Sequence, residues 1–245
     1  ERYITEELKT LETQILSAKE QAEALEHKAF ASLVAACVSD ISALISNARA
    51  IGLLDMLASH AETAVDLGYT RPRMNEEQGL HITEGRHPVI EQQLPVGETY
   101  VANDVGLHPD NRQILMVTGP NMSGKSALLR QTALISLMAQ AGSFVPAKSA
   151  DLGILDRIFT RVGASDNISS GESTFMVEMN ETAAILNNLT ERSLVLLDEI
   201  GRGTSTYDGV SIAWAIAEHL HESNRARPLT LFATHYHELN DMSQR

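Results

Sequence analysis

The sequence predicts an α/β protein in which a mostly parallel or mixed sheet is covered by helices, preceded by a purely helical segment. After residue 72, short β-rich apolar runs alternate with helical patterns, and such alternation is typical of a sheet covered by helices. Residues 5–51, in contrast, contain neither Gly nor Pro. We therefore expect two parts, a helical segment over residues 1–67 and an α/β domain over residues 68–245.

The helical segment carries a regular apolar seam. Its apolar residues alternate between spacings of three and four: Leu8, Leu11, Ile15, Ala18, Ala22, Leu25 and Ala29. This spacing is typical of a coiled-coil-like helix face. One continuous helix over residues 5–51 would be about 70 Å long, whereas a helical hairpin packed on its own domain fits the same pattern, and both stay open. Gly68 is the expected C-cap that ends this part.

The α/β part is expected to contain at least four strands and three helices. The expected strands are Ile114–Thr118, 157–162, 194–197 and Leu229–Thr234, and the expected helices are 125–141, 178–189 and 209–221. The run 194–197 is apolar throughout, as in a strand that is buried on both faces.

The composition excludes several classes of protein. No apolar run approaches the roughly 20 residues that a membrane-spanning helix needs, so we expect a cytoplasmic protein without membrane contacts. The net charge of −13 argues against these residues forming the main surface that binds DNA phosphates. Cys37 is the single cysteine, which excludes an internal disulfide. The start at Glu1, without Met, indicates a fragment of a longer protein.

A phosphate-binding pattern, G-x-x-x-x-G-K-[ST], is matched in full between an expected strand and an expected helix. The run is Gly119, Pro120, Asn121, Met122, Ser123, Gly124, Lys125 and Ser126, and Ala127 follows it. Glycines let main-chain N–H groups approach a phosphate, and the helix N-terminus favours the anion. Lys125 suits the β- and γ-phosphates and Ser126 suits Mg²⁺. The pattern predicts bound ATP with Mg²⁺; a chance match in a Gly-rich turn is the alternative.

Two carboxylates, Asp198 and Glu199, end the apolar run 194–197. Ligands of open α/β sheets bind outside the carboxyl ends of the strands, so both acids are expected at the phosphate edge. Asp198 suits Mg²⁺, directly or through water, and Glu199 suits general-base activation of the attacking water. This pair favours a hydrolase, and two solvated acids at a strand end are the alternative.

Longer strings are more specific than either motif. In chain order they are ERY at 1–3, GRHP at 85–88, TGPNM at 118–122, STFMVEM at 173–179, LDEIGRGTS at 197–205 and FATHY at 232–236. Together they resemble the MutS family of DNA mismatch repair proteins, in that family's order and over nearly the whole chain.

The resemblance implies an ABC-type ATPase that works as a homodimer with two composite ATP sites. Residues 1–67 would then belong to the family's core and lever helices. In the family, the P-loop and acidic pair of one subunit face the signature segment of the other, and Ser173 matches the signature serine. ATP would close this dimer and hydrolysis would loosen it. A local alternative for Ser173 is an N-cap of the following helix, and both roles are compatible.

The resemblance also assigns three further residues. His235 matches a residue that senses the γ-phosphate and helps place the attacking water, and a neutral imidazole can both donate and accept there. A structural histidine at the end of a strand is the alternative. Tyr100 matches an aromatic residue that stacks on adenine, although a packed surface tyrosine is the alternative. Asn121 matches a position that contacts phosphate. His87, in the GRHP string, receives no role.

The family's mismatch-reading, connector and clamp segments precede the matched part. Contacts with mismatched duplex DNA and with the repair protein MutL are therefore expected of a longer parent. Ser123 departs from the family's usual glycine, a change that many phosphate-binding loops accept.

Three rival functions stay open. A transporter ATPase would carry Leu-Ser-Gly-Gly-Gln where residues 169–174 read SSGEST. A chromosome-maintenance ATPase needs hundreds of residues between its nucleotide motifs, whereas Lys125 and Asp198 are 73 positions apart. Glu199 argues against a nucleotide switch without hydrolysis.

Overall fold

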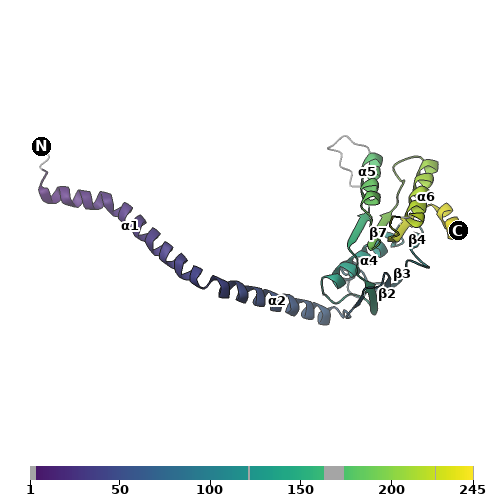
Figure 1. Ribbon diagram of the computed structural model, residues 1–245, viewed down its shortest axis with the longest axis horizontal. Coiled ribbons are helices and arrows are strands. Elements are labelled where there is room, and N and C mark those ends of the chain that lie inside the picture. The colour runs from purple at the N-terminus through teal and green to yellow at the C-terminus, as the bar shows by residue number, and fades with distance from the viewer. Residues whose placement is uncertain (1–3, 121, 163–173, 224, 245) are drawn as a thin grey trace. The chain divides into compact units, whose positions relative to one another are not determined.

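The computed structural model describes residues 4–120, 122–162, 174–223 and 225–244. The chain divides into two compact units, Glu1–Ser59 and His60–Arg245, and Figure 1 shows the long N-terminal helices and the α/β unit. The division falls inside a helix, and the domain boundary expected at residues 67 and 68 stays a prediction.

Two long helices form the N-terminal part, α1 (Glu6–Ser39) and α2 (Ile41–Asp66). The side chain of Thr5 caps α1 by accepting from the N–H of Leu8. Only Asp40 separates the helices, and its carbonyl accepts the N–H of Leu44 at 3.0 Å. Because antiparallel helices need a loop of about 2–5 residues between them, α1 and α2 do not form the hairpin that the sequence left open.

The apolar seam of α1 faces solvent in this chain. Leu8, Leu11, Ile15 and Leu25 are 54–74% exposed. By length and composition, α2 is also the one helix of the described residues that could cross a membrane, with a mean hydropathy of 1.4 over its most apolar 18 residues. The expectation that no apolar stretch reaches that length is therefore wrong. Length and composition alone are weak evidence for a membrane span, since core helices of soluble proteins share them.

Helix α2 ends at the expected C-cap glycine. Gly68 has φ +60°, and the N–H of Tyr69 donates to the carbonyl of Ala64 at 2.9 Å, the hydrogen bond of a Schellman motif. Arg86, from the GRHP string, donates to the carbonyls of Leu67 and Gly68 at 3.3 Å each. The prediction of a glycine cap at this point is confirmed.

A mixed sheet opens the α/β unit. Its strands, in the order β1-β5-β2-β3, are β1 (Arg73–Asn75), β5 (Ser149–Gly153), β2 (Leu80–Gly85) and β3 (Asn103–Leu107), and the short helix α3 (Ile90–Gln93) follows β2. Only the β1–β5 pair is parallel. None of these strands was among the expected runs. They have three to six residues, and β2 alternates buried and exposed positions, so their apolar signal is weak.

A second, wholly parallel sheet carries the motifs. Its strands, in the order β4-β8-β7-β6, are β4 (Ile114–Thr118), β8 (Leu229–Thr234), β7 (Ser193–Asp198) and β6 (Arg157–Arg161). The helices are α4 (Lys125–Gln140), α5 (Thr174–Asn187) and α6 (Thr206–Glu222), and the 3₁₀ helix η2 (His237–Gln244) ends the described chain. The predicted α/β class is confirmed, with a parallel and a mixed sheet in place of one sheet. All four expected strands and three expected helices are present, with ends shifted by a few residues.

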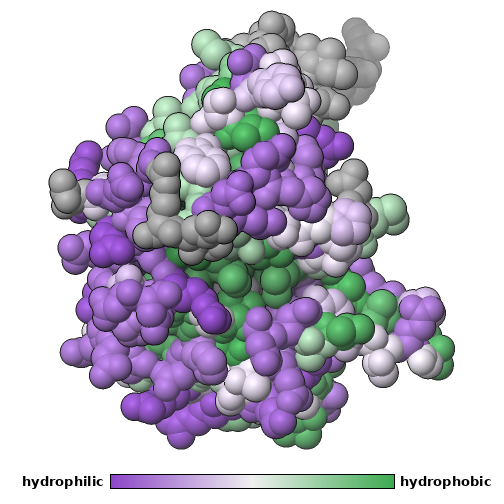
Figure 2. Space-filling model, turned by 90° about the vertical axis from the view of Figure 1, so that its right-hand side faces the viewer, coloured by the Kyte–Doolittle hydropathy of each residue, from purple (hydrophilic) through white to green (hydrophobic). Residues whose placement is uncertain are grey.

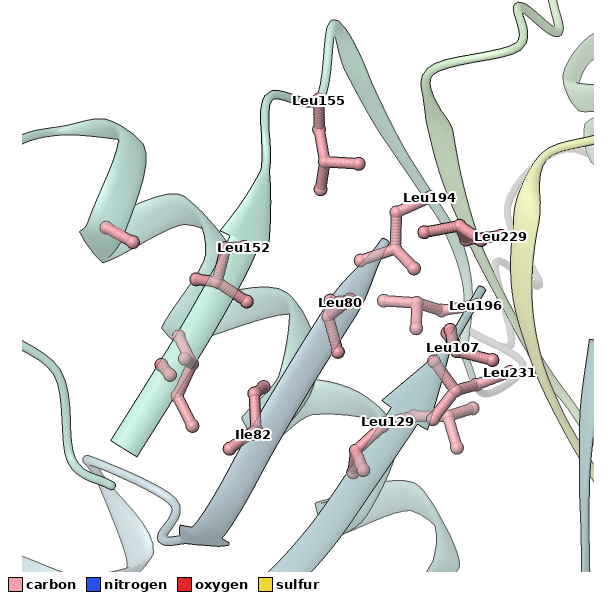
Figure 3. Close-up of a cluster of buried hydrophobic side chains, with 14 of the residues drawn as sticks. Leu80, Ile82, Leu107, Leu129, Leu152, Leu155, Leu194, Leu196, Leu229 and Leu231 are labelled. Carbon is pink, nitrogen blue, oxygen red and sulfur yellow. The ribbon is translucent and has the colours of Figure 1, made fainter. Parts of the chain in front are cut away.

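The apolar core holds the two sheets and α4 together. Figure 3 shows Leu80, Ile82, Leu107 and Leu152 of the mixed sheet near Leu129 of α4 and near leucines of β7 and β8. The other face of β7 packs in a second cluster with residues of α5 and α6. Every residue of β7 is buried. The carboxyl end of β7, which carries the acidic pair, is thus held on both faces.

The strand that leads into the glycine-rich loop lies at the edge of the parallel sheet, and its five residues are half-buried. A groove of about 670 Å³ runs beside it and is lined by Ile114, Met116 and Leu239, among others. Figure 2 shows one face of the molecule, on which apolar surface gathers in a hollow bordered by hydrophilic residues.

Candidate nucleotide-binding site

Three loops leave the parallel sheet at the carboxyl ends of its strands, which we call the phosphate edge of the sheet. Thr118, which ends β4, pairs with Thr234, which ends β8, and Asp198 at the end of β7 pairs with Ala233 of β8. The strands are parallel and β8 lies between the other two, so the ends of β4 and β7 lie about 10 Å apart. The fold therefore brings the glycine-rich loop and both carboxylates to one edge.

The glycine-rich loop closes around the Lys125 side chain. Lys125 is the first residue of α4 and is 7% exposed, and its Nζ donates to the carbonyls of Gly119 and Pro120 at 2.9 Å each. Gly119 has φ +154° and Gly124 φ +90°, conformations that favour glycine. A Cβ on Gly119 would lie 3.1 Å from Ser123 Oγ. Glycine at these positions is thus a requirement of the loop's shape.

The remaining loop residues explain how Ser123 is accommodated. The described residues with positive φ other than glycine are Glu84, Met122 and Glu199, so Ser123 does not need the freedom of the family's glycine. Met122 has φ +62° and is fully exposed. Ser126 and Ala127 lie partly buried in the first turn of α4. Asn121 lies outside the described residues, as does Ser173 of the proposed signature segment.

Asp198 presents an unpaired carboxylate oxygen. The residue is 9% exposed, and its Oδ1 is buried without a hydrogen-bond partner among the described residues. A buried anion without a partner is costly, so this oxygen suits a bound cation. The described part of the chain holds no group of three or more His, Cys, Asp or Glu side chains arranged for a metal. A site with one carboxylate still fits Mg²⁺, because Mg²⁺ takes one or two protein carboxylates together with phosphates and water.

Glu199 adopts a strained backbone conformation. Its φ is +55°, which costs a non-glycine residue about 1–3 kcal/mol and often occurs at functional sites. The N–H of Glu199 donates to the carbonyl of Ala233 at 2.9 Å, which ties the residue to β8. Its carboxylate pairs with Arg202.

His235 follows β8 directly and is exposed. Its ring lies 4.4 Å from the ring of Tyr236, centroid to centroid, at an interplanar angle of 44°. Tyr236 is buried, and its hydroxyl donates to the carbonyl of Gly201 at 3.0 Å. The imidazole is thus accessible at the sheet edge while its neighbour is anchored.

Tyr100 is anchored to α4. Its hydroxyl donates to Gln131 Oε1 at 3.1 Å, and Gln131 is fully buried. Burial, followed by the nearby Glu91 carboxylate, raises the pKa of Tyr100. The ring is half-buried, and its stacking on adenine stays a prediction.

His87 has a structural partner that the sequence did not indicate. The residue is 5% exposed, and its Nδ1 accepts from the N–H groups of Val89 and Ile90 at 3.2 Å each, at the start of α3. Burial lowers the pKa of His87, and the charge of Arg130 acts in the same direction. The GRHP string thus serves local structure, with His87 at α3 and Arg86 at the end of α2.

Glu178 is a second residue whose surroundings could not be predicted. It belongs to the STFMVEM string on α5, is 6% exposed, and accepts the N–H of Gly201 at 2.5 Å. A glutamate within an apolar helical string was the available signal.

Comparisons with known proteins agree with the strings. A family model described as MutS domain V matches residues 115–245. The DNA mismatch repair protein MutS of Flavobacterium psychrophilum is 65% identical over 244 residues, which cover 100% of this chain and 28% of that protein. The same-named protein of Christiangramia forsetii is 64% identical with the same coverage, and that of Porphyromonas gingivalis is 62% identical over 99% of this chain and 27% of its own length. This chain, which spans little more than a quarter of these relatives, belongs to the MutS family of DNA mismatch repair proteins.

Proposed function

We propose that this chain binds ATP with Mg²⁺ and hydrolyses it, as the ABC-type ATPase part of a DNA mismatch repair protein. One observation carries the proposal: the glycine-rich loop, the acidic pair and His235 follow three neighbouring parallel strands at one sheet edge. Open α/β sheets bind their ligands at this edge.

The phosphates are held by the loop and by the start of α4. The loop residues named above, with Gly119 and Gly124 at positive φ, offer N–H groups without a side chain in the way. Lys125 Nζ, which donates to two loop carbonyls, exchanges at least one of these bonds for a phosphate oxygen. The ammonium is therefore held close to its place of action in advance.

Ser126 and Asp198 are the proposed ligands of Mg²⁺. The Oδ1 of Asp198, which is buried without a hydrogen-bond partner in the part of the chain that the structure describes, supports this role. Bound Mg²⁺ neutralises charge on the phosphates. Glu199 accepts the proton of the attacking water as general base, and its tie to Ala233 of β8 keeps it at the sheet edge.

His235 and Tyr100 complete the nucleotide contacts in this proposal. The exposed imidazole of His235 orients the water and reads the γ-phosphate. The Tyr100 ring stacks on the adenine, and its hydrogen bond to Gln131 fixes the ring against the helix that begins with Lys125.

Ser173 is proposed to act across a homodimer. Its hydroxyl would contact the γ-phosphate bound to the second copy, so that ATP closes the dimer and hydrolysis loosens it. Helix α5 begins at Thr174, directly after this serine, and a helix N-terminus favours an anion. This arrangement makes two composite sites per dimer.

Mismatched duplex DNA and the repair protein MutL are proposed partners of the longer protein, in the cytoplasm. The net charge of −13 argues against these residues forming the main surface that binds DNA. The relatives named above are DNA mismatch repair proteins, so the transporter and chromosome-maintenance alternatives are not favoured.

The test is the ATPase rate per chain against protein concentration, for the purified protein and for Ser173→Ala. We expect the rate per chain to rise to a plateau as dimers form, and Ser173→Ala to remove most of the rise. A rate per chain that stays constant would contradict the shared site alone. Absence of ATP turnover at every concentration, with Mg²⁺ present, would overturn the proposed function.

A further inference from the structure

The backbone of Gly201, two residues after Glu199, is held from both sides by buried side chains. Its N–H donates to Glu178 Oε1 at 2.5 Å, and its carbonyl accepts the Tyr236 hydroxyl at 3.0 Å. Glu178 and Tyr236 are 6% and 5% exposed. We call these three residues the Gly201 clasp. It joins α5, the loop after β7 and the residues after β8.

The clasp is packed without slack. Gly201 has φ +87°, and a Cβ on it would lie 2.6 Å from the carbonyl oxygen of Gly209. A Cβ on Gly209, in the first turn of α6, would lie 2.3 Å from the Tyr236 hydroxyl oxygen. Neither position therefore has room for a methyl group, and the backbones of Gly201 and Gly209 lie in close contact.

Tyr236 touches both loops that carry the proposed reacting groups. Its hydroxyl holds Gly201, and its ring contacts the His235 ring at 4.4 Å. Its own N–H donates to Thr234 Oγ1 at 3.0 Å. Burial, followed by the charge of Glu178, raises the pKa of Tyr236, so the hydroxyl stays protonated and remains a donor.

Burying the Glu178 carboxylate costs free energy, and the hydrogen bond to one N–H group is a small return for it. A carboxylate this deeply buried must be desolvated, and its attraction to Arg161, whose Nη2 lies 3.7 Å from Glu178 Oε2, offsets that cost only in part. Buried ion pairs are weak evidence for stability. The proposed hydrolysis uses neither Glu178 nor Arg161 directly.

We propose that Glu178 and Tyr236 are positioning residues for ATP hydrolysis, which hold Gly201 and the His235 ring so that Glu199 and His235 face the same phosphate edge. This inference rests on the proposed ATPase function. Positioning of this kind acts on the chemical step, because small displacements of reacting groups lower the rate steeply, and it leaves nucleotide binding by the loop at Lys125 unchanged.

Tyr236→Phe is the sharpest variant, because it deletes only the hydroxyl and keeps the ring beside His235. We expect kcat for ATP to fall about 10- to 100-fold, while the Kd for ATP·Mg²⁺ stays within about twofold of the wild-type value. Tyr69→Phe is the matched control, since Tyr69 is likewise buried, at 8% exposed, and lies in the turn that ends α2, outside the loops that carry Glu199 and His235. It should leave kcat unchanged.

Glu178 is tested with two variants. Glu178→Gln keeps an oxygen that can accept the Gly201 N–H and should retain kcat within a few-fold, whereas Glu178→Ala should lose as much as Tyr236→Phe. Because both side chains hold one residue, the double variant Glu178→Ala/Tyr236→Phe should lose less than the product of the two single effects. If Glu178→Ala does not fold, Tyr236→Phe and Glu178→Gln decide the test.

The outcomes separate the two proposals. Wild-type protein that fails to hydrolyse ATP would overturn the ATPase function and this inference with it. Wild-type turnover together with an unchanged kcat in Tyr236→Phe would overturn the inference alone. A kcat loss matched by an equal loss of ATP affinity, or by the same loss in Tyr69→Phe, would assign Tyr236 to general stability and also overturn it.

Discussion

The carboxylate of Glu199 accepts a hydrogen bond from Arg202 Nη1 at 2.5 Å, three residues further along the same loop. The Glu199 side chain is 20% exposed and that of Arg202 is 67% exposed. A pair with one well-exposed partner contributes little stability, about 0–1 kcal/mol. The carboxylate is therefore easily released from Arg202, whereas its backbone is held by Ala233.

Replacing Glu199 with Ala should separate binding from hydrolysis. Loss of a general base is expected to lower ATP turnover by about 10²–10⁴, while the loop around Lys125 still binds ATP·Mg²⁺. Steady-state turnover and calorimetric binding measure the two effects. Glu191→Ala, which removes an exposed glutamate before β7, is the control. Unchanged turnover in Glu199→Ala would remove Glu199 from its proposed role.

Replacing Lys125 with Ala should weaken ATP binding itself. Hydrogen bonds to charged groups contribute about 1.5–3 kcal/mol, so the Kd is expected to rise roughly 10- to 150-fold. The loss of the bonds to Gly119 and Pro120 also loosens the loop. Lys148→Ala makes the same charge change at an exposed side chain and should bind ATP normally. Wild-type affinity in Lys125→Ala would contradict the phosphate site.

Asp198→Asn should weaken the Mg²⁺ binding on which turnover depends, without lowering the stability of the metal-free protein. The amide is a weaker Mg²⁺ ligand, so the Mg²⁺ concentration for half-maximal turnover should rise about tenfold or more. In EDTA the variant should unfold at a temperature no lower than wild type, because it removes a buried charge whose Oδ1 has no partner among the described residues. Activity titrations with Mg²⁺ and thermal unfolding check both effects. An unaltered Mg²⁺ response would exclude Asp198 as a ligand.

His87 predicts a pH dependence of folding stability. Its pKa is lowered in the folded protein, and protonated Nδ1 could not accept from Val89 and Ile90. Below the ordinary pKa of about 6.5 the unfolded state then binds more protons than the folded state, which lowers the free energy of unfolding. The stability that neutral His87 contributes is therefore present at higher pH and is lost as the pH falls below that value.

The variant His87→Asn isolates this contribution, because its side-chain oxygen can accept the same N–H groups without titrating. The difference in free energy of unfolding between wild type and His87→Asn should shift in favour of the variant from pH 7.5 to pH 5. Chemical denaturation at several pH values measures the difference. A difference that is constant with pH would show that His87 does not titrate with folding.

Local chemistry made part of this fold predictable. The continuous apolar run 194–197 predicts a strand buried on both faces, because a parallel strand covered on both sides has no polar face, and β7 is such a strand. Gly68 predicts the end of α2, because the left-handed conformation that ends many helices is strained for most residues with a side chain. The spacing within residues 119–126 predicts the glycine-rich loop for the same local reason.

Tertiary structure decided the rest. The mixed sheet of β1, β2, β3 and β5 is assembled from short, half-polar strands that acquire stability only from partners far along the chain, so no local pattern indicates it. The Gly201 clasp joins Glu178 and Tyr236 across 58 positions of sequence. Sequence by itself determined which residues can do phosphate chemistry, because that depends on side-chain type and local backbone freedom. Only the folded chain determined which of them share one edge and what holds them there, because hydrogen bonds and packing between distant segments exist only once the sheets have formed.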